Sequence, residues 1–160
     1  MSENRKEILD AIMRAMEIEK ETFDYYTRAE LKTFDPSGKK IFRWLAKTEE
    51  EHYVKLSELY SVMEEGGHWV FYGGSTISLE AEDPGDKEIG FTTGDLEALE
   101  ITMEIEKKGI AYFDDLASKT SDPNGMKMLT KLREEENEHL RVITEKYNQL
   151  RVKSEGIETH

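Results

Sequence analysis

The chain contains two copies of one sequence pattern, displaced by 87 residues. Ala-Met-Glu-Ile-Glu-Lys at 15–20 recurs as Thr-Met-Glu-Ile-Glu-Lys at 102–107, and Asp-Pro-Ser-Gly at 35–38 recurs as Asp-Pro-Asn-Gly at 122–125. Aligned without a gap from Leu9 onward, the copies share 20 identities in 55 positions. Unrelated sequences would share about three or four. Two copies are too few for a solenoid, so we expect one fold built from a duplicated unit.

Apolar residues in each copy recur with the four-then-three spacing of an amphipathic helix. They are Ile12, Met16, Phe23 and Tyr26 in the first copy and Leu99, Met103, Ile110 and Phe113 in the second. The Asp-Pro pairs at 35–36 and 122–123 predict the starts of two further helices, because aspartate caps free backbone N–H groups and proline suits the first helical position. Gly66 and Gly67 predict the end of the second helix. The pattern therefore predicts four helices of about 25 residues.

Residues 66–93, between the copies, have a different composition, with six glycines and one proline. A helix of 25 residues is about 37 Å long, and an extended connector of this length can span it. The strand-like runs at 69–72 and 76–79 are candidates for pairing with each other or with a second chain. We expect an all-α fold, an antiparallel four-helix bundle of two duplicated helical hairpins, 3–65 and 94–153, joined by a long crossover connector.

Each predicted helix interrupts its apolar stripe near the middle with carboxylate or imidazole side chains. These are Glu19 in the first helix, Glu49 and His52 in the second, Glu106 in the third, and Glu136 and His139 in the fourth. Four charged carboxylates in a bundle core would each cost on the order of several kcal/mol if unpaired. The stripes offer no lysine, so two divalent cations are the simplest way to neutralise the four carboxylates.

A single Glu-x-x-His pair arises often by composition in a chain this rich in glutamate. Two pairs in register, with two further inward glutamates, favour a metal site, since residues i and i+3 on a helix can reach the same cation. The set matches the known carboxylate site of di-iron and di-manganese helix bundles. Neighbouring glutamates are expected to lie on solvated faces: Glu50, Glu51, Glu134, Glu135 and Glu138.

Composition narrows the chemistry and the partners. The chain has no cysteine, which excludes disulfides, thiolate metal sites and iron–sulfur clusters, so oxygen and imidazole must hold any metal. Its formal net charge of -13 makes nucleic acid and an anionic membrane surface unfavourable partners. No segment resembles a signal peptide or a membrane span, so we expect a cytoplasmic protein.

These motifs resemble those of the ferritin-like di-iron carboxylate proteins, and most closely the rubrerythrin-like branch. The shared features are Met-Glu-Ile-Glu-Lys followed by paired aromatics at 25–26 and 112–113, and Glu-x-x-His in the second and fourth helices. The resemblance covers nearly all of the chain outside the connector, and it implies a single ferritin-like domain over residues 1–160.

The resemblance also implies a role for each of the six residues. Glu49 and Glu136 would bridge two iron ions, Glu19 and Glu106 would be terminal ligands, and His52 and His139 would each bind one iron. Manganese or zinc could take the place of iron in such a site.

The implied activity is that of a di-iron oxidoreductase reducing peroxide or dioxygen. Rubrerythrins carry a rubredoxin domain held by cysteines, and this sequence has none, so a separate electron-donor protein is expected. Gly109 stands where rubrerythrins have an extra glutamate, which leaves six ligands, as in a bacterioferritin-type ferroxidase. Two alternatives remain open: a ferroxidase that oxidises Fe(II), and a metal-stabilised structural bundle without catalysis.

Tyr26 lies on the core face seven residues after Glu19, where it could hydrogen-bond a ligand, donate an electron or simply pack in the core. Tyr25 and Tyr112 recur just off the inner stripe and are expected to pack. Gly109 is expected to permit close helix packing. A homodimer is expected for a helical bundle of this size, with the connector as a candidate contact.

Overall fold

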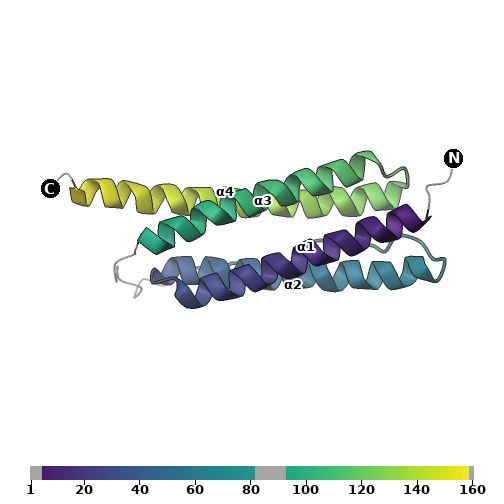
Figure 1. The fold of residues 1–160 in the computed structure, drawn as a ribbon, viewed down its shortest axis with the longest axis horizontal. Helices are drawn as coiled ribbons and strands as arrows, with labels where there is room; N and C mark the ends of the chain where they lie inside the picture. The colour runs from purple at the N-terminus through teal and green to yellow at the C-terminus, as the bar shows by residue number, and fades with distance from the viewer. Residues whose placement is uncertain (1–4, 82–92, 159–160) are drawn as a thin grey trace.

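The computed structural model describes residues 5–81 and 93–158. Its helices are α1 (Arg5–Lys32), α2 (Pro36–Glu64), α3 (Thr93–Ser118) and α4 (Pro123–Glu158). Figure 1 shows α1 and α2 as one antiparallel hairpin, α3 and α4 as a second, and the two hairpins lying side by side along their length. The prediction of an all-α bundle of two hairpins is confirmed, and the described residues contain no strand.

The second helix of each hairpin begins at the predicted Asp-Pro pair. The side chain of Asp35 accepts a hydrogen bond from the backbone N–H of Gly38 at 2.8 Å, so it caps α2. In the second hairpin, Asp122 accepts from the backbone N–H groups of Asn124 at 2.8 Å and Gly125 at 3.0 Å. The first hairpin ends as predicted, with α2 stopping just before Gly66, whose φ of +88° is in the left-handed region that favours glycine.

The duplication in the sequence is also visible in the contacts between the hairpins. The hydroxyl of Tyr25 on α1 donates to the carbonyl of Ala98 on α3 at 3.2 Å. The hydroxyl of Tyr112 on α3 donates to the carbonyl of Ala11 on α1 at 2.7 Å. Both members of the second bond lie 87 positions from members of the first, so the hairpins are related by an approximate twofold axis. These tyrosines do more than pack, since they join the two copies.

The strand-like runs of the connector, 69–72 and 76–79, do not form strands. Residues 66–81, which we call the strap, instead run in irregular conformation against α2 and α4. Trp69 packs so closely on Gly125 that a Cβ on that glycine would lie 2.5 Å from the indole. Further along, the indole N–H of Trp44 donates to the carbonyl of Ile77 at 3.2 Å. Hydrogen bonds from helix side chains, such as that of Trp44, take the place of the backbone hydrogen bonds that the predicted strands would have made.

The chain restarts as α3 at the opposite end of the bundle from the end of α2, which makes every neighbouring pair of helices antiparallel (Figure 1). The predicted crossover is therefore confirmed, although residues 82–92 of the connector lie outside the described residues. None of the helices in the described part of the chain has the length and hydropathy needed to cross a membrane.

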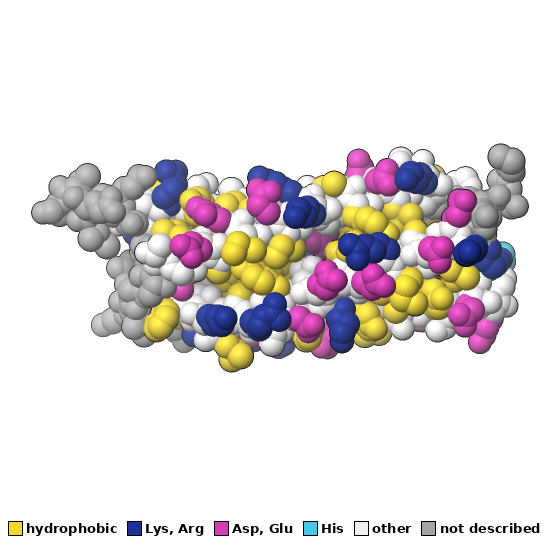
Figure 2. Space-filling model, viewed as in Figure 1, with side chains coloured by type: hydrophobic (Ala, Val, Ile, Leu, Met, Phe, Trp, Pro, Cys, Tyr) yellow, Lys and Arg dark blue, Asp and Glu magenta, His cyan; other side chains and the backbone are white. Residues whose placement is uncertain are grey.

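The core consists of two apolar layers, one toward each end of the bundle. The first includes Ile12, Met16, Leu56, Leu59, Phe113 and Leu132, and the second includes Tyr26, Ile41, Phe42, Leu45, Leu99 and Ile143. In the face seen in Figure 2, hydrophobic side chains gather in separate patches along the seam between α1 and α3, and charged side chains surround them. The residues between the two layers are polar, and they form the site described next.

Candidate metal centre

The six predicted site residues converge between the two apolar layers. All are buried, with at most 3% of each residue exposed. They form two overlapping groups, each with donor atoms within 4.8 Å of one another: Glu19, Glu49, His52 and Glu136 in the first, and Glu49, Glu106, Glu136 and His139 in the second. All four helices therefore contribute to one cluster, because each carries its polar interruption at the same height in the bundle.

Glu49 and Glu136 belong to both groups, so the carboxylates of α2 and α4 lie in the middle of the cluster. Each outer end of the cluster holds one glutamate and one histidine. The two imidazole rings are nearly parallel, with an interplanar angle of 11° and centroids 6.3 Å apart. The approximate twofold axis of the fold thus passes through the cluster and relates its two halves.

Both histidines turn the same ring nitrogen inward. The Nδ1 atom of His52 lies 3.3 Å from Glu136, 3.7 Å from Glu19 and 3.8 Å from Glu49. The Nδ1 atom of His139 lies 3.4 Å from Glu49, 3.5 Å from Glu106 and 3.9 Å from Glu136. The Nδ1 atom of each imidazole therefore faces three carboxylates.

Six donor atoms of the cluster lack hydrogen-bond partners among the described residues. The atoms are Glu19 Oε2, Glu49 Oε1, Glu106 Oε2, Glu136 Oε1 and the Nδ1 atoms of His52 and His139. A buried polar atom left unpaired costs about 1–3 kcal/mol. Unpaired oxygen and nitrogen donors that converge in two groups of four match the coordination of two divalent cations, so the residues fit a dinuclear metal site.

Without cations, the cluster retains protons. Burial alone would lower the pKa of His139, but the carboxylates of Glu106, Glu49 and Glu136 outweigh it and raise that pKa to about 10. The pKa of His52 is raised well above its ordinary value in the same way by Glu135, Glu136 and Glu49. Burial, followed by the charge of Glu136, raises the pKa of Glu106 to about 8. A cation entering the cluster must displace these protons.

Tyr26 is fully buried, and its hydroxyl donates a hydrogen bond to Oε1 of Glu106. Burial and the negative charge of Glu106 raise the pKa of Tyr26 well above its ordinary value, so the phenol keeps its proton. Of the three roles considered for Tyr26 from the sequence, a hydrogen bond to a predicted metal ligand is therefore the one observed. In the second copy the corresponding position is Phe113, which has no hydroxyl to offer Glu19.

Glu51 and Glu135, which were predicted to lie on solvated faces, are partly buried in the structure. Glu135 is partly buried and accepts hydrogen bonds from the hydroxyl of Tyr72 at 2.8 Å and the backbone N–H of Ser75 at 2.7 Å. Glu51 accepts from the hydroxyls of Ser75 and Thr76, both at 2.6 Å. The prediction was wrong for these two residues because the strap covers the outer faces of α2 and α4. Glu50, Glu134 and Glu138 are exposed, as predicted.

Sequence reasoning missed Glu135 as a neighbour of the site. One of its carboxylate oxygens, Oε1, lies 3.6 Å from Nε2 of His52. The duplication offered one signal that could have identified Glu135. Thr48 occupies the corresponding position in the first copy, so the two copies differ directly beside the Glu-x-x-His motif.

Gly109 is buried, but close helix packing does not explain it. A Cβ on this residue would meet only the carboxylate of Glu136, at 3.5 Å and 3.8 Å. These are ordinary contact distances, so the glycine leaves room for a methyl group beside one of the central carboxylates. Its counterpart in the first copy is Thr22, whose hydroxyl donates to the carbonyl of Ile18 at 2.8 Å.

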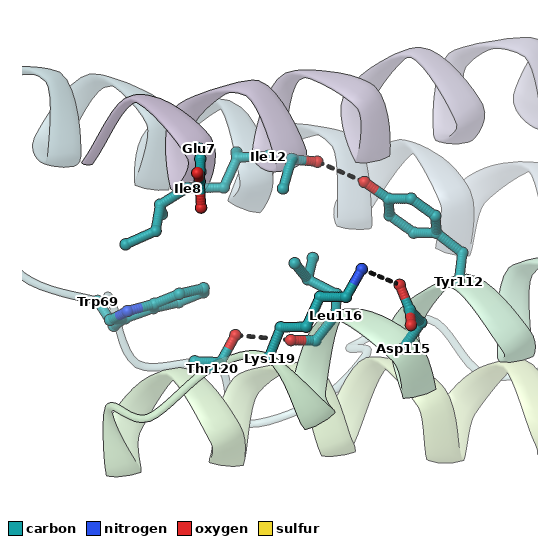
Figure 3. A pocket seen from close by; sticks show the side chains of 10 residues that line it. Glu7, Ile8, Ile12, Trp69, Tyr112, Asp115, Leu116, Lys119 and Thr120 are labelled. Atoms are coloured by element: carbon teal, nitrogen blue, oxygen red, sulfur yellow. Dashed lines mark hydrogen bonds and ion pairs between the residues drawn. The ribbon is translucent and has the colours of Figure 1, made fainter. Parts of the chain in front are cut away.

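A cavity of about 340 Å³ lies near one end of the bundle, away from the cluster. Figure 3 shows Ile8 and Ile12 of α1 on one side, Tyr112 and Leu116 of α3 on the other, and Trp69 of the strap at its end. None of the six clustered residues lines it. This cavity is therefore separate from the candidate metal centre.

Comparison with known proteins agrees with the geometry of the cluster. The family model described as Rubrerythrin matches residues 10–147, a span that reaches all four helices and contains the six clustered residues. Neither a curated protein nor a solved structure matches the chain. A family match over this share of the sequence is decisive for membership. The chain belongs to the rubrerythrin family.

Proposed function

We propose that this protein is a di-iron oxidoreductase that reduces peroxide or dioxygen. One observation carries the proposal: two groups of buried, unpaired carboxylate and imidazole donors share Glu49 and Glu136. Shared carboxylates can hold two cations close together, and a pair of adjacent metals can act on one small oxidant. Membership of the rubrerythrin family supports iron as the metal.

The six residues would divide the ligand roles by their place in the cluster. Glu49 and Glu136, which belong to both groups, would bridge the cations. Glu19 and His52 would complete one half-site, and Glu106 and His139 the other. Carboxylates and imidazoles also suit manganese and zinc, so the identity of the bound metal is part of the proposal.

Two bound Fe(II) ions supply two electrons, and the reduction of hydrogen peroxide to two waters consumes two electrons and two protons. The electrons would be restored by a separate electron-donor protein. The chain's own residues prepare the site for this chemistry. The apolar layers on either side limit contact with bulk water, and the hydrogen bond from Tyr26 holds the orientation of Glu106. The room beside Glu136 left by Gly109 could admit a small oxidant.

The decisive experiment loads the protein with Fe(II) without oxygen, measures iron per chain, and then adds hydrogen peroxide or dioxygen. We expect about two iron ions per chain and consumption of about one peroxide per pair. The oxidised protein should return to the ferrous state with a chemical reductant and react again. Glu49→Gln, which alters a shared carboxylate, should lose the reaction. Glu134→Gln, on an exposed residue of α4, should keep it.

The alternatives give different results in the same experiment. Iron that is oxidised once and then passes into a mineral would support a ferroxidase. Tight metal binding with no consumption of oxidant would support a metal-stabilised structural bundle. Either result would overturn the proposed activity.

A further inference from the structure

The two histidines of the cluster are equivalent in the repeat, but their outer ring nitrogens have different surroundings. The Nε2 atom of His52 faces the carboxylate of Glu135, with 3.6 Å between Nε2 and Oε1. Among the described residues, no carboxylate lies within 4 Å of Nε2 of His139. The ring of His139 instead packs edge-on against Trp44, with centroids 4.8 Å apart. Among the described residues, one half of the site therefore has an anionic neighbour that the other half lacks.

The difference arises from a substitution between the two copies. Glu135 immediately precedes the ligand motif of α4, and Thr48 precedes the motif of α2. The hydroxyl of Thr48 donates to the carbonyl of Trp44 in its own helix at 2.9 Å, so it is not directed to an imidazole. Because α2 and α4 are neighbours and antiparallel, a residue preceding the motif of α4 lies beside the histidine of α2.

The strap holds Glu135 in this position. The hydroxyl of Tyr72 and the backbone N–H of Ser75 both donate to Oε1 of Glu135. The ring of Tyr72 also packs edge-on against the ring of His52, with centroids 5.8 Å apart and an interplanar angle of 89°. Tyr72 thus contacts both the carboxylate and the imidazole.

Two buried atoms at this contact lack hydrogen-bond partners among the described residues, namely Nε2 of His52 and Oε2 of Glu135. A neutral imidazole that binds a metal through Nδ1 carries its proton on Nε2 and needs an acceptor for it. The separation of 3.6 Å between Nε2 and Oε1 is longer than a hydrogen bond, and an approach of about 0.5 Å would bring the two atoms into range.

We propose that Glu135 is a positioning residue for His52, which accepts its Nε2–H and directs Nδ1 toward the metal, so that the half-site of Glu19 and His52 binds its cation more tightly than the half-site of Glu106 and His139. The inference rests on the proposed metal centre and deepens it. A carboxylate acceptor makes a ligating imidazole a stronger donor and fixes its orientation. Filling of the site would therefore be ordered, with the His52 half occupied first.

The test is a titration of the metal-free protein with Co²⁺, which reports its coordination through visible absorption and needs no oxidant. In the parent protein we expect two distinct binding steps. Glu135→Gln keeps the shape of the side chain and removes its charge, and it should weaken the tighter step about 10- to 100-fold while leaving the weaker step unchanged. Glu134→Gln, one residue away and exposed, is the matched control and should change neither step.

Tyr72→Phe provides a second variant that keeps both the carboxylate and the aromatic ring. Loss of the hydroxyl that holds Glu135 should weaken the same step by a smaller factor, and this variant also serves if Glu135→Gln does not fold. Two equal binding steps in the parent, or equal constants for Glu135→Gln and Glu134→Gln, would overturn the inference and leave the metal centre standing. Failure of the parent to bind about two Co²⁺ per chain would overturn the metal centre itself.

Discussion

The hydroxyl of Tyr26 on α1 donates a hydrogen bond to the carboxylate of Glu106 on α3, across the interface between the two hairpins. The bond joins the copies at the level of the six clustered site residues, and both partners are buried. It is absent from the twofold-related position, where phenylalanine occupies site 113. A single hydroxyl therefore distinguishes Glu106 from Glu19, its counterpart in the first copy.

Tyr26→Phe should destabilise the metal-free protein by about 1–3 kcal/mol, because it leaves a buried carboxyl oxygen without its donor. The ring itself should still fit, as the phenylalanine at 113 does in the other copy. With zinc bound the loss should be smaller, because Glu106 then has a cation as partner. Urea unfolding of the metal-free and zinc-loaded forms measures both values. Equal losses in the two forms would contradict the coupling of Tyr26 to the site.

The metal-free protein should become less stable as the pH rises. The pKa of Glu106 is raised to about 8 and that of His139 to about 10, so both groups bind protons more tightly in the folded chain than in the unfolded one. Their contribution to folding is complete at low pH and is lost as the pH rises through these values. Thermal unfolding in the presence of a chelator between pH 6 and pH 10 would show the decline. A constant Tm over this range would be inconsistent with protons held in the cluster.

Metal binding should have the opposite pH dependence and should strengthen as the pH rises. At pH 7 the raised pKa values of His52, His139 and Glu106 keep these groups protonated, so loading of both metals should release about three protons. Calorimetry of zinc binding in buffers with different ionisation enthalpies counts them. His52→Ala should release fewer protons than the parent. Binding without proton release would contradict the ligand set.

Removal of the metal should lower the stability of the parent protein but not that of a variant that cannot bind it. Free ligand at 100 times its Kd stabilises a folded protein by about 2.7 kcal/mol. Glu49→Gln should lose most of the zinc-dependent increase in Tm, because Glu49 belongs to both groups of donors. The exposed control Glu134→Gln should behave as the parent in both forms.

Two glycines should respond in opposite ways to alanine. At Gly125 a new Cβ would lie 2.5 Å from the indole of Trp69 and 2.8 Å from the methyl group of Thr120, so Gly125→Ala should cost about 1–3 kcal/mol. At Gly109 the nearest atom would be 3.5 Å away, so Gly109→Ala should stabilise the fold by about 0.5–1 kcal/mol through its better helix propensity. Denaturant unfolding of both variants in the metal-free state gives the comparison. Destabilisation by Gly109→Ala would show that the space beside Glu136 is smaller than described.

The helices and the six clustered residues could be predicted because their determinants are local and periodic. An apolar stripe with a spacing of four and three defines a helix face, and a polar residue on that stripe must enter the core. Aspartate and proline marked the starts of α2 and α4, and the duplication placed every interruption at the same height. The position of these residues in the centre of a bundle follows from the sequence alone.

The path of the strap was not predictable in this way. Its runs of aromatic and β-branched residues have strand propensity, but a strand also needs a partner at hydrogen-bonding distance. The tertiary structure instead offers Gly125 as a surface for Trp69 and the carboxylates of Glu51 and Glu135 as acceptors. These contacts join positions that are 24 to 63 residues apart in the chain, so no local sequence pattern predicts them.

The sequence by itself determined a duplicated bundle with a polar layer of four glutamates and two histidines, because periodicity decides which side chains face the core. Only the tertiary structure decided that the two halves of this layer differ. The antiparallel contact of α2 with α4 brings Glu135 to His52, and the strap fixes it there, whereas Thr48 at the corresponding position bonds within its own helix and offers His139 no carboxylate. The physical reason is that helix periodicity specifies a face, but the partner that a side chain meets on that face depends on how separate helices and the strap pack together.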